Sequence, residues 1–140
     1  MKVHMKKKLL FLCTGNSCRS QMAEGLLRRI AGDKYEVFSA GVEPSKVHPI
    51  SIIVMNEAGI DISSHHSDDV KDYLNAGIDI VISVCDHASQ TCPVFPGDVQ
   101  RVNWSVEDPY HGWAVDESKI PDYRRTRDEL KERILDFLEQ

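Results

Sequence analysis

A continuous apolar run near the start of the chain leads directly into a polar turn. Residues 9–12 are all apolar, and the next eight residues, 13–20, are small, polar or charged. An apolar run without alternation predicts a strand buried on both faces, here over residues 8–13, as in a parallel sheet. Apolar residues at helical spacing then predict a helix over residues 21–31. This order of strand, tight turn and helix predicts an α/β fold.

The rest of the chain continues this alternation. We expect strands at 35–40, 78–84 and 99–104, helices at 49–58 and from residue 120 or 121 onward, and a short helix that starts at Ser67 or Asp68 and ends near residue 74. Residues 85–91 are polar and compatible with a helix. Strands that alternate with helices predict a parallel sheet with right-handed crossovers. We expect one domain over residues 1–140, with residues 1–7 as a flexible basic extension.

The turn that begins at Cys13 has the composition of an oxyanion site. Backbone N–H groups of a tight turn and of a helix N-terminus attract anions. Gly15 is expected to supply the backbone angles of a closed loop, and Arg19 offers a planar pair of donors. Asn16 and Ser20 are short polar groups that can orient the loop and the sulfur. We expect Cys13 to have a lowered pKa, about 3.5–7.5 instead of about 8.5, and to act as a nucleophile.

Two further groups are expected at the same edge of the sheet. Cys85 directly follows the predicted strand 78–84, and Asp108 follows the predicted strand 99–104. The carboxyl ends of parallel strands form the ligand-binding edge, so both groups should lie near Cys13. Asp108 precedes Pro109, which is also typical of a simple turn. With Cys13 upstream, we favour a general acid that protonates a leaving oxygen.

Charge and cysteine content exclude several classes of protein. Seventeen basic and 22 acidic residues give a net charge of −5, which predicts no nucleic-acid-binding surface. The apolar run after the basic start is too short for a signal peptide or a membrane span, so we expect a cytoplasmic protein without membrane association. Four cysteines in such a protein indicate catalysis or metal binding rather than structural disulfides. The spacings between the cysteines are not those of a usual zinc site.

The string CTGNSCRSQMAEG, residues 13–25, resembles the phosphate loop of the low-molecular-weight protein tyrosine phosphatase superfamily, and most closely that of its thioredoxin-coupled arsenate reductases. The resemblance extends from about residue 7 to the C-terminus. It implies a three-layer fold with a four-stranded parallel sheet of order 2-1-3-4, flanked by helices. It also implies that arsenate, or its analogues phosphate and sulfate, binds to Thr14, Gly15, Asn16, Ser17, Cys18, Arg19 and Ser20.

The string CDHASQTCP, residues 85–93, resembles the redox segment of the same arsenate reductases. The resemblance implies that Cys13 attacks arsenate while Asp108 protonates the departing oxygen. Cys85 then attacks Cys13 and releases arsenite, and Cys92 attacks Cys85 to free Cys13. Thioredoxin is the implied electron donor, and we expect a monomer.

Other interpretations stay open. The string DPYHG, residues 108–112, is more typical of the phosphatases, so a tyrosine phosphatase, or a weak phosphatase side activity, is an alternative. A non-catalytic sensor of redox state or phosphate is a third. Cys18 could pair with Cys13, although we favour a packing role. The family also implies a potassium ion at Asn16, Glu24, Ser39 and Asp68, whose simpler interpretation is hydrogen bonding and a helix cap.

Overall fold

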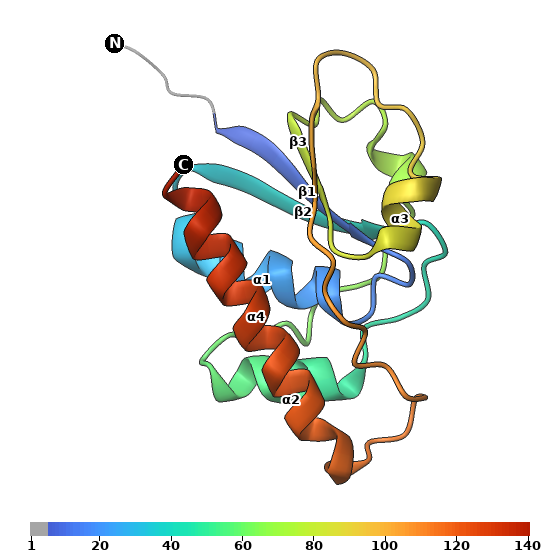
Figure 1. Cartoon of the computed structure of the whole chain (residues 1–140), viewed down its shortest axis with the longest axis vertical. Coiled ribbons are helices and arrows are strands. Elements are labelled where there is room, and N and C mark those ends of the chain that lie inside the picture. The colour runs from blue at the N-terminus through green and yellow to red at the C-terminus, as the bar shows by residue number, and fades with distance from the viewer. Residues whose placement is uncertain (1–5) are drawn as a thin grey trace.

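Strand β1 (Lys7–Cys13) is a central strand of a parallel sheet in the computed structural model, which describes residues 6–140 (Figure 1). Its neighbours are β2 (Tyr35–Gly41) and β3 (Ile80–Ser83), and β4 (Gln100–Asn103) completes the order β2-β1-β3-β4. The side chains of residues 9–12 have no exposed surface. The predicted fold and strand order are therefore confirmed, and the apolar run is the core of the sheet.

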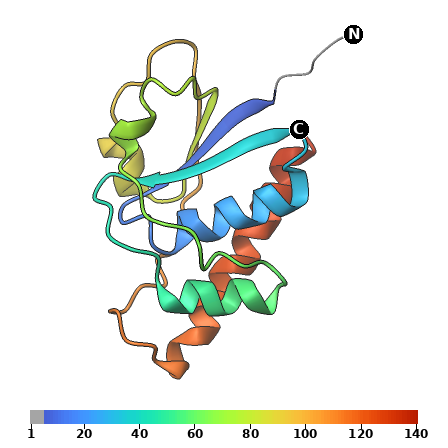
Figure 2. The ribbon, with the colours of Figure 1, turned by 180° about the vertical axis from the view of Figure 1, so that it is seen from behind.

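The other elements connect and cover these strands. They are α1 (Arg19–Ala31), α2 (Pro49–Glu57), the 3₁₀ turn η1 (Val70–Tyr73), α3 (Asp86–Thr91), the 3₁₀ turn η2 (Glu117–Lys119) and α4 (Ile120–Leu138). Helices α1, α2 and α4 gather on one side of the sheet, and α3 lies on the other (Figures 1 and 2). Helix α1 packs closely against the segment after α2, since a Cβ on Gly25 would lie 2.9 Å from Ile62 Cγ2.

The register of the sheet brings the carboxyl ends of the strands to one edge. Cys13 pairs with Gly41 of β2, Leu12 pairs with Ser83 of β3, and Ser83 pairs with Asn103 of β4. The loops that leave β1, β3 and β4 therefore start side by side. These three loops carry the predicted site residues Cys13, Cys85 and Asp108, so the register of the sheet explains why these residues lie at one edge.

Several predicted boundaries are wrong by one to three residues. Strand β1 begins at Lys7, inside the predicted basic extension, and residues 1–5 of that extension lie outside the described residues. Helix α1 begins at Arg19, so the arginine belongs to its first turn. Residues 67–74 form only the four-residue turn η1, because the cap is Asp69, whose carboxylate accepts the Lys71 N–H, and not Ser67 or Asp68. Across residues 6–140, every helix is too short or too polar to cross a membrane.

Candidate active site

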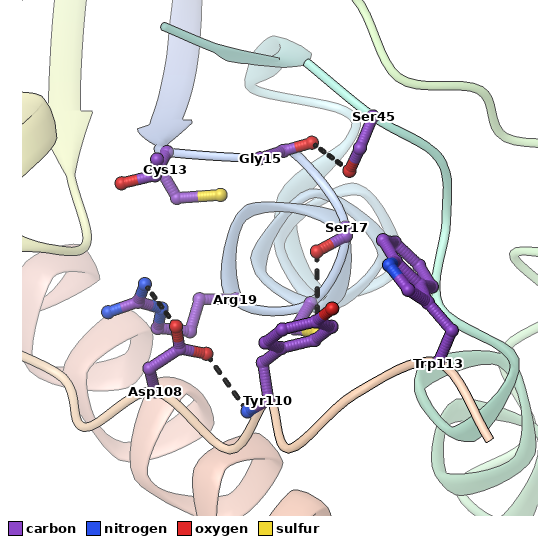
Figure 3. A pocket seen from close by; sticks show the side chains of 10 residues that line it. Cys13, Gly15, Ser17, Arg19, Ser45, Asp108, Tyr110 and Trp113 are labelled. Atoms are coloured by element: carbon purple, nitrogen blue, oxygen red, sulfur yellow. Dashed lines mark hydrogen bonds and ion pairs between the residues drawn. The ribbon is translucent and has the colours of Figure 1, made fainter. Parts of the chain in front are cut away.

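A cavity of about 240 Å³ opens at the carboxyl edge of the sheet (Figure 3). Its floor is the turn between β1 and α1, and its walls come from the segments that follow β2 and β4. The lining residues are Cys13, Thr14, Gly15, Ser17, Cys18, Arg19, Ser45, Asp108, Tyr110 and Trp113. Cys18, at the N-cap of α1, makes no side-chain hydrogen bond that caps the helix. The cavity combines a thiol, a guanidinium and a helix N-terminus, which together suit a small oxyanion.

The closed shape of the turn depends on Asn16 rather than on Gly15. Asn16 has φ 50°, in the left-handed region, which asparagine tolerates better than most residues. Its side chain donates to Ser20 Oγ at 2.8 Å and to Ser39 Oγ at 3.0 Å, and its Oδ1 accepts the Asp68 N–H at 2.9 Å. Gly15 does not have a positive φ. The prediction that Gly15 supplies the special backbone angles is therefore wrong.

Asn16 and Ser20 are fully buried and lie behind the turn, outside the lining of the cavity. Ser20 Oγ lies 2.8 Å from Cys13 Sγ, and the Asn16 N–H donates to the same sulfur at 3.2 Å. These contacts hold the sulfur in place. Both residues therefore support the loop and the thiol, as their short polar side chains suggested. The prediction that Asn16 and Ser20 also bind the oxyanion is not met, because neither residue lines the cavity.

Burial controls the protonation of Cys13. Cys13 is only 3% exposed, and this desolvation raises the pKa of the thiol above its ordinary value. The hydrogen bond from Ser20 and the positive charge of Arg19 both lower the pKa, but they offset only part of the effect of burial. The predicted lowering of the Cys13 pKa is therefore wrong in this structure. The sequence displays the groups that stabilise a thiolate, whereas it does not show how completely the sulfur is covered.

Arg19 and Asp108 meet at the edge of the cavity. Arg19 Nη2 lies 3.3 Å from Asp108 Oδ2, and Arg19 Nη1 donates to Val106 O at 2.9 Å. The Tyr110 N–H donates to Asp108 Oδ1 at 3.0 Å, so the carboxylate closes a turn as well as facing the guanidinium (Figure 3). The Asp108 side chain is half exposed. Arg19 therefore links the turn of residues 13–20, called the oxyanion loop below, to the loop that carries Asp108.

Two aromatic rings and a serine also line the cavity, and two of these three residues, Trp113 and Ser45, are not among the predicted site residues. Tyr110 and Trp113 stand edge to face, with ring centroids 5.3 Å apart. Ser45 Oγ donates to Gly15 O at 3.1 Å and supports the loop from the segment after β2. No signal in the sequence separates Trp113 or Ser45 from other loop residues. Tyr110 was indicated only by its position after Asp108 and Pro109.

Cys85 lies at the edge of the oxyanion loop. Its sulfur is 3.5 Å from Thr14 Oγ1 and accepts the Ala88 N–H at 3.4 Å, which makes Cys85 the N-cap of α3. Cys92 is the C-cap of the same helix. It is half-buried, and burial raises the pKa of its thiol. The structure thus brings Cys85 to the loop and places Cys92 at the far end of a six-residue helix.

Cys18 is a second buried thiol that lines the cavity. Its sulfur lies 3.7 Å from the Tyr123 hydroxyl of α4 and 3.5 Å from Ser17 Oγ. Burial raises the pKa of this thiol. These contacts join the loop to α4, in line with a packing role, which stays a prediction.

The four residues predicted to bind potassium gather in one hydrogen-bonded cluster behind the loop. Ser39 Oγ donates to Glu24 Oε1 at 2.5 Å, and Asn16 bonds to both Ser39 and Asp68. A potassium ion would need oxygen atoms that are free to coordinate it. Here the Asp68 carboxylate already contacts the Tyr73 hydroxyl at 2.7 Å and His66 Nδ1 at 2.8 Å.

A positive charge is already present in this cluster. Arg28 Nη2 lies 2.5 Å from Glu24 Oε2 and 2.7 Å from Val37 O. A cation beside Glu24 would have to compete with this guanidinium, so the fit of the residues to potassium is poor. The potassium ion stays a prediction from the resemblance, and no step proposed below passes through it.

Comparisons with known proteins agree with this arrangement. The family model described as low molecular weight phosphotyrosine protein phosphatase matches residues 8–140. An arsenate reductase from Halalkalibacterium halodurans is 46% identical over 134 residues, which cover 96% of this chain and 96% of that protein. An arsenate reductase from Bacillus subtilis is 40% identical over 136 residues, which cover 96% of this chain and 98% of that protein.

Solved structures give the same result. An arsenate reductase in the phosphate binding state superposes with a TM-score of 0.78 at 36% identity, over 94% of this chain and 95% of that one. A low molecular weight protein tyrosine phosphatase from T. tengcongensis superposes with a TM-score of 0.76 at 28% identity, over 96% and 99% of the two chains. The chain therefore belongs to the low molecular weight phosphotyrosine protein phosphatase family and, within it, to the group of the arsenate reductases.

Proposed function

We propose that this chain reduces arsenate to arsenite with three of its cysteines and takes electrons from thioredoxin. The observation that carries the proposal is the position of Cys85, whose sulfur lies 3.5 Å from Thr14 Oγ1 of the oxyanion loop. A phosphatase needs one thiol, an arginine and an acid. Reduction of arsenate also needs two electrons. Cys13 and a second thiol beside the loop can supply them together by forming a disulfide.

The first step joins arsenate to Cys13. The oxyanion binds to the N–H groups of the loop and to Arg19, and Cys13 Sγ forms a bond to arsenic. One arsenate oxygen leaves as water, which receives the proton that the Cys13 thiol gives up. Asp108, at the edge of the cavity, passes a proton to this oxygen.

The second step reduces arsenic. Cys85 attacks Cys13 Sγ, the S–As bond breaks, and its electron pair stays on arsenic, which leaves as arsenite. Two thiols have then become one Cys13–Cys85 disulfide, and As(V) has become As(III). Cys92 next attacks Cys85, which forms a Cys85–Cys92 disulfide and frees Cys13 as a thiol. Thioredoxin, a dithiol protein, reduces this last disulfide and completes the cycle.

The two aromatic side chains that line the cavity favour a second candidate function, the hydrolysis of an aryl phosphate. Tyr110 and Trp113 line the same cavity as Cys13, and an aromatic leaving group could pack against them. This reaction would use Cys13, Arg19 and Asp108 and would leave Cys85 and Cys92 idle. We infer that any such activity is secondary, because it does not account for a thiol beside the loop.

One experiment compares the two functions. The reduced protein is mixed with arsenate, thioredoxin, thioredoxin reductase and NADPH, and NADPH oxidation is followed; hydrolysis of a tyrosine phosphate is measured beside it. We expect arsenate-dependent NADPH oxidation that stops when thioredoxin is left out. Hydrolysis of the phosphate ester without arsenate-dependent oxidation would refute the proposed reduction and favour the phosphatase.

A further inference from the structure

His48 is a fully buried histidine that the proposed reaction does not use. It precedes Pro49, the first residue of α2, and its backbone N–H donates to Ser17 O of the oxyanion loop at 3.0 Å. Its ring reaches the loop that carries Asp108 and contacts Gly112 O. One residue therefore touches three segments that are far apart in the sequence.

The two ring nitrogens of His48 have different partners. Nδ1 accepts the Ile50 N–H at 3.1 Å and caps α2, so Nδ1 carries no proton. Nε2 lies 2.7 Å from Gly112 O, which can only accept, so Nε2 must carry the proton. These partners select the neutral ring with the proton on Nε2. The bond at Nδ1 holds the ring in the orientation that the bond at Nε2 requires, and the reverse is also true.

The loop bends sharply where His48 holds it. Gly112 has φ 101°, a conformation that residues with side chains rarely adopt. The ring of His48 stacks on Trp113 at 5.2 Å with an interplanar angle of 16°, and Tyr110 meets it edge-on at 6.0 Å. Tyr110 and Trp113 both line the cavity. His48 is thus the buried anchor of the cavity wall that begins at Asp108.

We propose that His48 is a positioning residue that fixes the Asp108 loop against the oxyanion loop through its Nε2–H bond to Gly112. The inference rests on the proposed function, in which Asp108 delivers a proton to the leaving oxygen. Arg19 also ties the two loops, but it lines the cavity, and in the proposed reaction its guanidinium also binds the oxyanion. The bond from His48 lies outside the oxyanion site and can persist through every step.

Two substitutions separate the two bonds of the ring. His48→Asn keeps a short side-chain oxygen that can cap α2, since asparagine is a favourable N-cap residue, but it cannot reach Gly112. His48→Gln carries an N–H at nearly the distance of Nε2 and can restore the bond to Gly112. His66→Asn, the same change at an exposed histidine outside this cavity, is the matched control. Thermal unfolding of each variant shows that it is folded.

The reaction is measured as one turnover, without thioredoxin, by the rate at which reduced enzyme releases arsenite. Affinity for the loop is measured separately with inorganic phosphate as a competitor. A shift of about 1 Å in a reacting group costs about a hundredfold. We expect His48→Asn to release arsenite about 10- to 100-fold more slowly, with phosphate affinity within about threefold of wild type. His48→Gln should recover to within about fivefold of wild type, and His66→Asn should match it.

The hydrogen-bonding arrangement of the His48 ring can be tested directly in the wild-type protein. Nitrogen NMR of the imidazole should show a proton on Nε2 of His48 and none on Nδ1. The proposal is overturned if His48→Asn reacts at the wild-type rate, if it loses phosphate affinity in proportion to rate, or if His48→Gln is as slow as His48→Asn. A wild-type enzyme that releases no arsenite refutes the proposed function itself, and with it the role of His48 in that reaction.

Discussion

Closing a disulfide between Cys85 and Cys92 should unwind α3. The two cysteines cap the two ends of this helix, seven residues apart, and the helix between them spans Asp86–Thr91. At a rise of about 1.5 Å per residue, their Cα atoms are about 10 Å apart. A disulfide does not span more than about 7 Å between Cα atoms without backbone movement. The helix and the disulfide therefore exclude each other.

The cost of this movement is small. The bonds at risk include those from Ser89 N–H to Cys85 O at 3.2 Å, from Ala88 N–H to Cys85 Sγ at 3.4 Å, and from Thr91 Oγ1 to His87 O at 2.8 Å. Two or three hydrogen bonds at about 1 kcal/mol each correspond to a change of about 30- to 150-fold in amide protection. We expect exchange in residues 85–92 to accelerate by this factor when the disulfide forms.

Amide hydrogen exchange of the double variant Cys13→Ser/Cys18→Ser tests this prediction, because only Cys85 and Cys92 of the four cysteines remain. The same variant in its reduced form is the matched control. Strands β1 and β3 should stay protected in both forms, since their residues are buried in the sheet. Equal protection of residues 85–92 in the two redox states would refute the argument, because it would mean that the bond forms without loss of the helix.

Four other changes test the site. Cys13→Ser should abolish both arsenate reduction and any phosphate ester hydrolysis; measurable turnover of either substrate would place the nucleophile elsewhere. Cys85→Ser and Cys92→Ser should lose multiple turnover with arsenate but keep any ester hydrolysis within about threefold, and Cys92→Ser should accumulate a Cys13–Cys85 disulfide in peptide mass mapping. Because burial raises the pKa of Cys13, the rate of Cys13 alkylation by iodoacetamide, without added oxyanion, should rise about tenfold per pH unit between about pH 7 and 9; a rate already level at pH 7 would contradict the raised pKa. Gly41→Ala should lower stability by about 1–3 kcal/mol in denaturant unfolding and slow the reaction, since its Cβ would lie 2.6 Å from Thr14 O; wild-type stability and rate would argue against a close approach of the two strands' ends.

Local patterns were enough to predict the sheet and the position of Cys13 at its carboxyl edge. The apolar run over residues 9–12 has one stable place in an α/β fold, and a turn directly after it has to lie at the carboxyl edge of the sheet. The strand order came from the resemblance and is confirmed. Cys85 and Asp108 were placed at the same edge because each follows a strand. This reasoning uses only neighbours in the sequence, which is why it succeeded.

The errors arise where contacts are distant in the sequence. The left-handed residue of the loop is Asn16, and it is stabilised by Ser39 and by Asp68, which lie 23 and 52 positions away. The burial that raises the pKa of Cys13 comes from the whole fold. Trp113 lines the cavity because a buried histidine holds its loop. Such effects depend on which distant segments pack together, and one sequence without its structure does not specify this.

The position of Cys85 also bears on how such a site distinguishes arsenate from phosphate. The two tetrahedral anions are nearly alike in shape and charge, and the loop offers both the same N–H groups and the same guanidinium. The difference lies in the adduct with Cys13. When Cys85 attacks the sulfur of an arsenic adduct, arsenic can keep the electron pair and leave as As(III). Phosphorus in the equivalent adduct resists this reduction, so the adduct must wait for water. In the proposed cascade, the Cys85 thiol, 3.5 Å from Thr14 Oγ1, would therefore select arsenate after binding, by the chemistry of the adduct, and the cavity would not need to exclude phosphate.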